Sequence, residues 1–205
     1  MEPRLYQLMF KLGNRMNFKA REVASRYWME GLSFGLADGI ICCLGLIMGV
    51  AEATVTLSLI ERRSIIITSG VLGGLANAFG NSIGFFLSQE TERSVQIHEA
   101  RLGMKTRVHT KREVLMSGVL SFSATLLTLL ILIVPFLFLD VQTSLVIAFI
   151  FGITLSFSMG SYVGKLGKGN MLRTGLKYAV LAVIGALVSY AIGNLLNMFL
   201  PFHAM

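Results

Sequence analysis

Long apolar segments alternate with short polar connections along this chain. Five of them are long enough to cross the ~30 Å hydrocarbon core of a bilayer, which takes about 20 helical residues. They cover about 31–59, 64–88, 114–139, 142–164 and 172–199. The pattern predicts an all-α integral membrane protein with five transmembrane helices.

The first 30 residues follow a different pattern, in which apolar side chains recur every three or four positions. Leu5, Leu8 and Leu12 share one helical face, and Lys11 and Arg15 fall on another. This is typical of an amphipathic helix at the membrane interface, and a helix docked on the soluble side is the alternative. We therefore divide the chain into an amphipathic cytoplasmic or interfacial helix at 1–30 and a transmembrane domain at 31–205. A short cytoplasmic helical extension is expected at about 89–112, broken near Gly103.

Composition supports a membrane protein, because 54% of the residues are hydrophobic and 14% are charged, against roughly a quarter charged in soluble domains. Sixteen Lys and Arg residues precede the first span or lie in the 2–3 and 4–5 connections, and only Arg62 and Arg63 fall on the other side. The positive-inside rule then predicts a cytoplasmic N-terminus and an outside C-terminus. This distribution also accounts for the net charge of +7 without nucleic acid.

No nucleotide-loop, zinc or catalytic-triad motif is present, so we expect no enzyme and no cofactor.

Two carboxylates lie inside the first apolar segment, where ionisable groups are costly and usually face a bundle interior or a wet cavity. Asp38, Cys42, Gly45, Gly49 and Glu52 are spaced four, three, four and three apart, which predicts one shared helical face. Asp38 and Glu52 stand roughly 21 Å apart along the axis. They are therefore expected to form two separate sites along the helix, because they cannot bind one ion together. The Gly45–Gly49 pair lets another helix approach closely.

The second segment carries a stripe of small and polar residues that includes Asn77 and Asn81, one turn apart. These amides are either interhelical hydrogen-bonding partners or neutral oxygen ligands that face Asp38 and Cys42. The connection that follows offers Glu90, Glu92 and Glu99 as further candidates. Carboxylates suit divalent metals, but the interleaved basic residues also fit an ordinary solvated helix.

Three stretches resemble the vacuolar iron transporter family. "LADGIICCLGLIMGVAEA" (36–53) is similar to its first helix, with an Asp-Gly pair before a glycine-spaced apolar run. "SGVLGGLANAFGNSIGFFLSQETERS" (69–94) and "GLKYAVLAVIGALVSYAIGNLL" (175–196) resemble its second and last helices.

The resemblance implies a homodimer whose first helices line a path for Fe²⁺ or Mn²⁺, which leave the cytosol in exchange for protons. It places the family's metal-binding aspartate at Asp38 and its cytoplasmic exit glutamate at Glu92. Asn81 stands where known members have a metal-binding methionine, and a hard oxygen there weakens selectivity for iron. The large glutamate-bearing insertion of many members is reduced here to about 25 residues.

We therefore predict a multi-pass transporter of a prokaryotic cell membrane that exports a divalent transition metal by proton antiport. The candidate metal ligands are Asp38, Asn81, Cys42, Glu92, Asn77, Glu99, Glu90 and Glu52. A passive, metal-gated cation channel on the same scaffold is one alternative. A non-transporting membrane scaffold, in which Asp38 pairs with a basic residue, is another.

Overall fold

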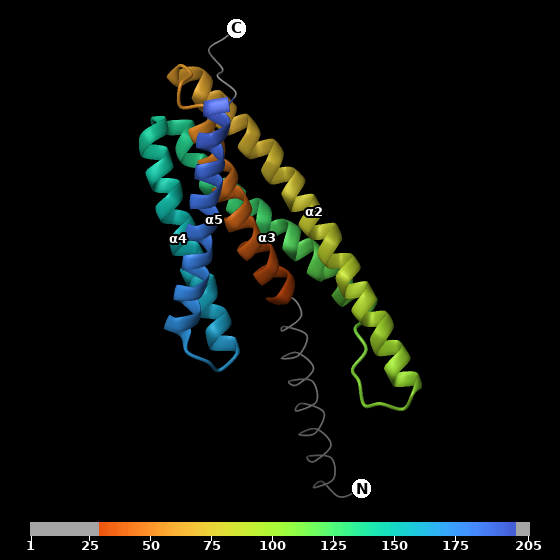
Figure 1. The fold of residues 1–205 in the computed structure, drawn as a ribbon. Coiled ribbons are helices and arrows are strands. Elements are labelled where there is room, and N and C mark those ends of the chain that lie inside the picture. Colours follow the sequence, from red (N-terminus) through yellow and green to blue (C-terminus); the bar gives the residue numbers. More distant parts are fainter. Residues whose placement is uncertain (1–28, 200–205) are drawn as a thin grey trace, which may run out of the picture.

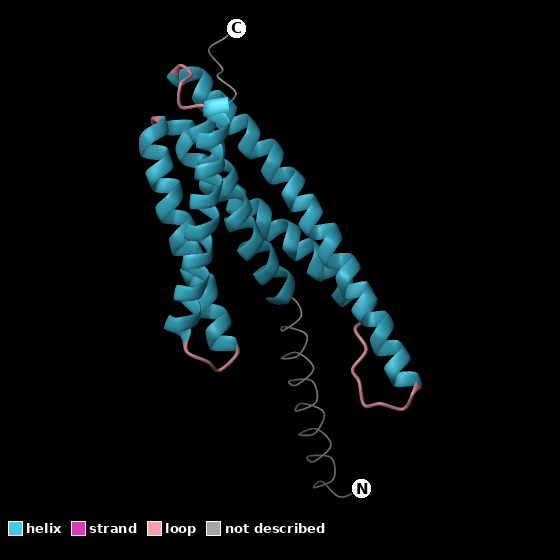
Figure 2. Cartoon of the chain, in the orientation of Figure 1, coloured by secondary structure: helices cyan, strands magenta, loops and turns pink. Residues whose placement is uncertain are grey.

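A computed structural model describes residues 29–199, and these residues form helices and short connections without any strand (Figure 2). All five helices are long and apolar enough to cross a membrane. The predicted all-α, five-span architecture is therefore confirmed. The amphipathic helix expected at 1–30 falls almost entirely outside the described residues. The helices are Met29–Ala53, which we call the first helix, α2 (Leu59–Arg101), α3 (Lys111–Phe138), α4 (Val141–Leu166) and α5 (Met171–Phe199).

The boundary between the first two spans differs from the prediction. The first helix ends at Ala53 and not near Leu59, and α2 begins at Leu59 instead of residue 64. The cause is a capping box, in which the Ser58 hydroxyl accepts from the Glu61 N–H and the Glu61 carboxylate accepts from the Ser58 N–H. Such a box satisfies two backbone donors that a helix start would leave unpaired. The apolar run continues across this turn, so hydropathy alone did not reveal it.

Helix α2 contains 43 residues. At 1.5 Å per residue it is about 65 Å long, roughly twice the hydrocarbon thickness, so one end must leave the membrane. Figure 1 shows this end as the long arm that leads to the 2–3 connection. The predicted helical extension to about 112 is wrong beyond Arg101, because residues 102–110 are not helical. The break expected near Gly103 is confirmed: Gly103 has φ +80°, a conformation that glycine adopts without strain.

The first helix lies between the α2–α3 pair and the α4–α5 pair (Figure 1). Its Ile40, Leu44 and Ile47 side chains are almost completely buried. On one side, a methyl group added at Gly35 would lie 2.2 Å from the Ser121 carbonyl oxygen of α3. On another, the Gly193 position of α5 packs directly on the backbone of Gly49. The first helix is thus the central element, and small residues allow its close contacts on both sides.

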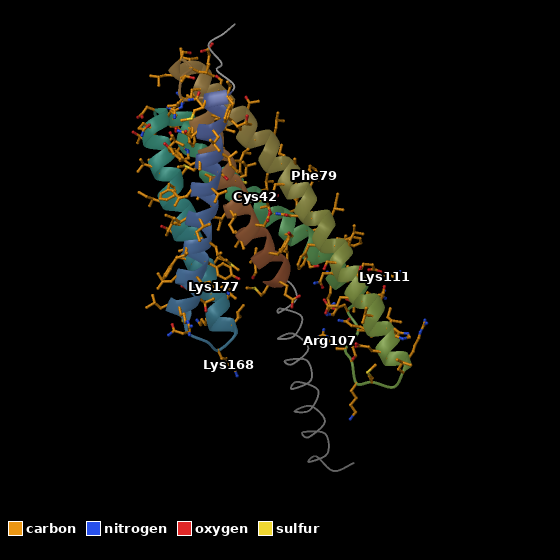
Figure 3. The ribbon with its side chains drawn as sticks, in the orientation of Figure 1. Cys42, Phe79, Arg107, Lys111, Lys168 and Lys177 are labelled. Carbon is orange, nitrogen blue, oxygen red and sulfur yellow. The ribbon has the colours of Figure 1, made fainter. Side chains whose placement is uncertain are left out.

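Basic side chains gather toward one end of the bundle. Figure 3 labels Arg107, Lys111, Lys168 and Lys177 at the end that holds the 2–3 and 4–5 connections. The opposite end holds the turn at 54–58 and the short α3–α4 connection. This asymmetry agrees with the positive-inside argument, and the membrane orientation itself stays a prediction.

Candidate metal-transport site

Asp38 and Asn81 come together between the first helix and α2. The Asn81 amide nitrogen donates to Asp38 Oδ2 at 2.7 Å and to the Thr125 hydroxyl oxygen of α3 at 3.1 Å. Asn81 is buried, whereas Asp38 is half-buried. The sequence left two roles open for the α2 amides, interhelical hydrogen bonding or metal ligation opposite Asp38, and the structure shows Asn81 in direct contact with Asp38 and with α3.

Thr125 is the residue that the sequence argument missed. Its hydroxyl donates to the Gly35 or the Ser121 carbonyl oxygen, each at 3.0 Å, while it accepts from Asn81. It is completely buried where α3 crosses the first helix. The signal was present as small polar residues at every third or fourth position of α3, opposite the four-residue glycine spacing in the first helix. The stripe consists of Ser117, Ser121, Thr125 and Thr128.

Asp38 has no cationic partner among residues 29–199. The two salt bridges found there join Arg93 to Glu90 and Arg107 to Glu113, both far along the chain from Asp38. Its hydrogen-bond donor Asn81 is neutral, so the contact orients the carboxylate without balancing its charge. A carboxylate at membrane depth without a counter-ion is expensive. This position therefore favours a cation, either a proton or a metal ion.

The neighbouring candidates differ in their environment. Cys42 follows Asp38 by one helical turn and is exposed on the surface of the single chain, where Figure 3 labels it. The adjacent Cys43 is buried in the core. Asn77 lies one turn before Asn81, and its amide nitrogen is buried without a hydrogen-bond partner in the described part of the chain. Cys42 can therefore supply a ligand beside Asp38, and Asn77 has an unused polar group.

Glu52 occupies a separate place near the other end of the first helix. Its Oε1 accepts from the Asn194 amide nitrogen of α5 at 3.0 Å. Asp38 thus contacts α2, while Glu52 contacts α5. The five residues expected on one face do not line one common opening within the chain, because α5 packs against Gly45 and Gly49 between them.

The glutamates at the extended end of α2 have local partners. Glu90 pairs with Arg93 at 3.5 Å, Glu92 accepts from Gln96 at 3.1 Å, and Glu99 accepts from the Thr106 hydroxyl at 2.8 Å. Gln96 also accepts from the backbone N–H of buried His109, which holds the 102–110 connection against α2. Across residues 29–199 no group of three or more His, Cys, Asp and Glu side chains could hold a metal ion. In this conformation these glutamates are hydrogen-bonding partners of α2 and its connection.

The ligand set near Asp38 is therefore mixed. Carboxylate and amide oxygens are hard donors that suit Mn²⁺, Mg²⁺ and Ca²⁺, and the Cys42 sulfur adds a soft donor that suits later transition metals. The Asn81 amide nitrogen donates to Asp38 and Thr125, and no hydrogen bond to its carbonyl oxygen is found among the described residues. A cation placed there could use oxygens of both side chains. The site is incomplete within one chain, since these groups fall short of the six ligands that such ions commonly take.

Two comparisons with known proteins show what this chain is similar to. Residues 32–102, which include Asp38, Asn81 and the extension of α2, match the model of the VIT family. The chain is also 28% identical over 182 residues to an uncharacterized protein of Methanocaldococcus jannaschii, an alignment that covers 83% of this chain and 89% of that one.

Proposed function

We propose that this multi-pass membrane chain is a metal ion transporter of the VIT family, whose model residues 32–102 match, and that it exports Fe²⁺ or Mn²⁺ by proton antiport. The single observation that carries the proposal is Asp38. It is a membrane-depth carboxylate with a neutral amide partner and no basic partner among the described residues. Burial favours the protonated form of a carboxylate, and a bound cation favours the ionised form. One group of this kind can exchange a proton for a metal ion.

The geometry also bears on the alternatives. The scaffold alternative pairs Asp38 with a basic residue, whereas among residues 29–199 the side chain bonded to Asp38 is Asn81. A passive channel remains compatible with the same ligands, and only the energetics of transport separate it from an antiporter.

We further propose a homodimer in which the first helices of two copies face each other. The support is the exposed position of Cys42 beside Asp38, because a second copy would cover this edge and add its own ligands. A pair of chains would double the ligand set and approach six donors.

The test is metal uptake into sealed proteoliposomes that carry an imposed proton gradient. We expect Mn²⁺ or Fe²⁺ to accumulate above its external concentration, and to stop doing so when an ionophore collapses the gradient. Flux that persists downhill and never becomes uphill would identify a channel.

Asp38→Asn is the decisive variant, because the amide preserves shape but cannot carry a proton or balance a metal charge. Asp140→Asn is its matched control, since Asp140 is an exposed N-cap of α4 and asparagine caps equally well. We expect at least about a hundredfold loss of uptake for Asp38→Asn, as for removal of a charged ligand worth about 3 kcal/mol. Equal uptake by both variants would refute the role of Asp38.

A further inference from the structure

Two arginines lie at the end of the bundle where positive charge is not expected. Arg62 and Arg63 belong to the first turn of α2, beside the 54–58 turn. Arg62 Nε donates to the Ala51 carbonyl oxygen at 3.1 Å, and Arg63 Nε donates to the Phe136 carbonyl oxygen at 2.6 Å. Each arginine thus satisfies a carbonyl near the C-terminal end of a neighbouring helix, where helices leave acceptors unpaired.

These bonds do not use all the donors of the two guanidinium groups. Arg62 is only 9% exposed, yet no hydrogen bond from its two terminal nitrogens is found among the described residues. Polar groups buried to this extent are normally paired. The terminal nitrogens of Arg62 therefore have N–H groups that an acceptor in a neighbouring cavity can use.

Both arginines line a cavity of about 500 Å³, a volume within the range of small-molecule sites. Its wall comes from the first turns of α2 and α4 and includes Leu59, Ile60, Asp140 and Gln142. Two arginines and one aspartate give the lining a net charge of +1. The cavity therefore favours a group with a single negative charge.

An apolar groove of about 520 Å³ lies along α3 and α4, next to the short connection that joins these two helices. It is lined by Val134, Phe138 and Leu139 at the end of α3 and by Ile147 and Phe151 of α4. Leu139 of the groove directly precedes Asp140 of the polar cavity, so both lie at the α3–α4 connection. A charged pocket at the bundle end, followed by an apolar groove that runs into the membrane, matches the two parts of a lipid.

We propose that this cavity binds the phosphodiester of a membrane phospholipid, with one acyl chain in the α3–α4 groove. Guanidinium groups match phosphate oxygens in geometry and charge, and the hydrogen bonds between them are stronger in a partly buried site. The lipid supplies acceptors to Arg62 and joins the ends of the first helix, α2 and α4. This inference depends on the membrane location of the chain and not on metal transport.

The experiment is native mass spectrometry of the full chain, delipidated in detergent and titrated with phosphatidylglycerol. Diacylglycerol with the same acyl chains is the phosphate-free probe. We expect adducts with the phospholipid at least about tenfold more readily than with diacylglycerol, because the charged contacts are lost in the latter. Equal retention of both would show an unspecific apolar groove and overturn the proposal.

Gln142→Glu is the informative variant, because it adds a negative charge to the cavity and leaves both arginines in place. An acidic residue in the first turn of α4 is also favourable for the helix, so the variant should fold. We expect about tenfold weaker phosphatidylglycerol binding than for Gln142→Met, which is neutral and similar in size. Arg62→Gln should lose binding too, whereas Arg112→Gln, exposed at the other end of the bundle, should not. Unchanged binding in Gln142→Glu would refute the site.

Inorganic phosphate separates a lipid from a soluble anion. If the occupant is a lipid, millimolar phosphate should leave the adduct in place, since it lacks the acyl chain. Displacement by phosphate at that concentration would overturn the lipid assignment and point to a soluble phosphate compound. Absence of lipid binding together with intact metal uptake would overturn only the lipid proposal. Lipid binding without metal uptake would overturn only the transport proposal.

Discussion

Gly35→Ala tests whether close contact between the first helix and α3 supports the candidate site. The new methyl group would lie 2.2 Å from the Ser121 carbonyl oxygen and 2.8 Å from Ser121 Cα, whereas ordinary contacts begin near 3.4 Å. The two backbones must therefore separate by about 1 Å. The movement also stretches the 3.0 Å hydrogen bond from the Thr125 hydroxyl to the Gly35 carbonyl oxygen, and Thr125 in turn supports Asn81.

The expected magnitude follows from three terms. Overpacking of a tight core costs about 1–3 kcal/mol. Weakening of one neutral hydrogen bond adds up to about 1 kcal/mol. The higher helix propensity of alanine relative to glycine stabilises the variant by about 1 kcal/mol and offsets part of this cost. We expect a net destabilisation of about 1–3 kcal/mol, together with weaker metal uptake, because Asn81 loses its support.

The assay is reversible unfolding in mixed micelles, followed by circular dichroism, with uptake measured on the same variants. Gly84→Ala is the matched control, since its methyl group would meet no atom of the described structure within 4 Å. It should be neutral or stabilised by up to about 1 kcal/mol. If Gly35→Ala is as stable and active as Gly84→Ala, the contact between the first helix and α3 is not as tight as described.

Three further predictions concern other parts of the chain. In the proposed dimer, oxidative cross-linking in membranes should join two chains through exposed Cys42; Cys42→Ser should abolish the dimer band on gels, while Ser at buried Cys43 should not. Hydrogen bonds from the start of α4 hold the pKa of Asp140 below its usual value. The N-cap contribution is therefore present above the usual pKa of aspartate and is lost as pH falls through the lower, folded value. The stability difference between wild type and Asp140→Ala, measured by acid titration, should shrink there, and a difference that grows with acid would contradict this sign. Gln96→Ala should release the 102–110 connection from α2 and raise its rate of tryptic cleavage about tenfold, as expected for lost hydrogen bonds of about 1–2 kcal/mol; an unchanged rate would show that the contact with His109 is unimportant.

Hydropathy predicted the five spans because each must bury its backbone polar groups in lipid as a helix, and only long apolar runs can do so. It failed at residues 54–63, where an apolar stretch continues across a turn. Sequence could have located that turn through the Ser58–Glu61 pair, since a capping box is a local pattern. It could also predict the break at Gly103, where glycine follows the last helix-favouring residues of α2.

The sequence by itself determined the membrane class, the helices and the presence of a costly carboxylate at Asp38. These properties depend on neighbouring residues and on the contrast between lipid and water. Only the tertiary structure decided that Asn81 contacts Asp38 and that Thr125 contacts Asn81. It also decided that Glu52 faces α5. The physical reason is that a helical face can meet any of several neighbours, and the choice depends on which backbones can approach one another. Here Gly35 admits α3, and Gly49 admits α5.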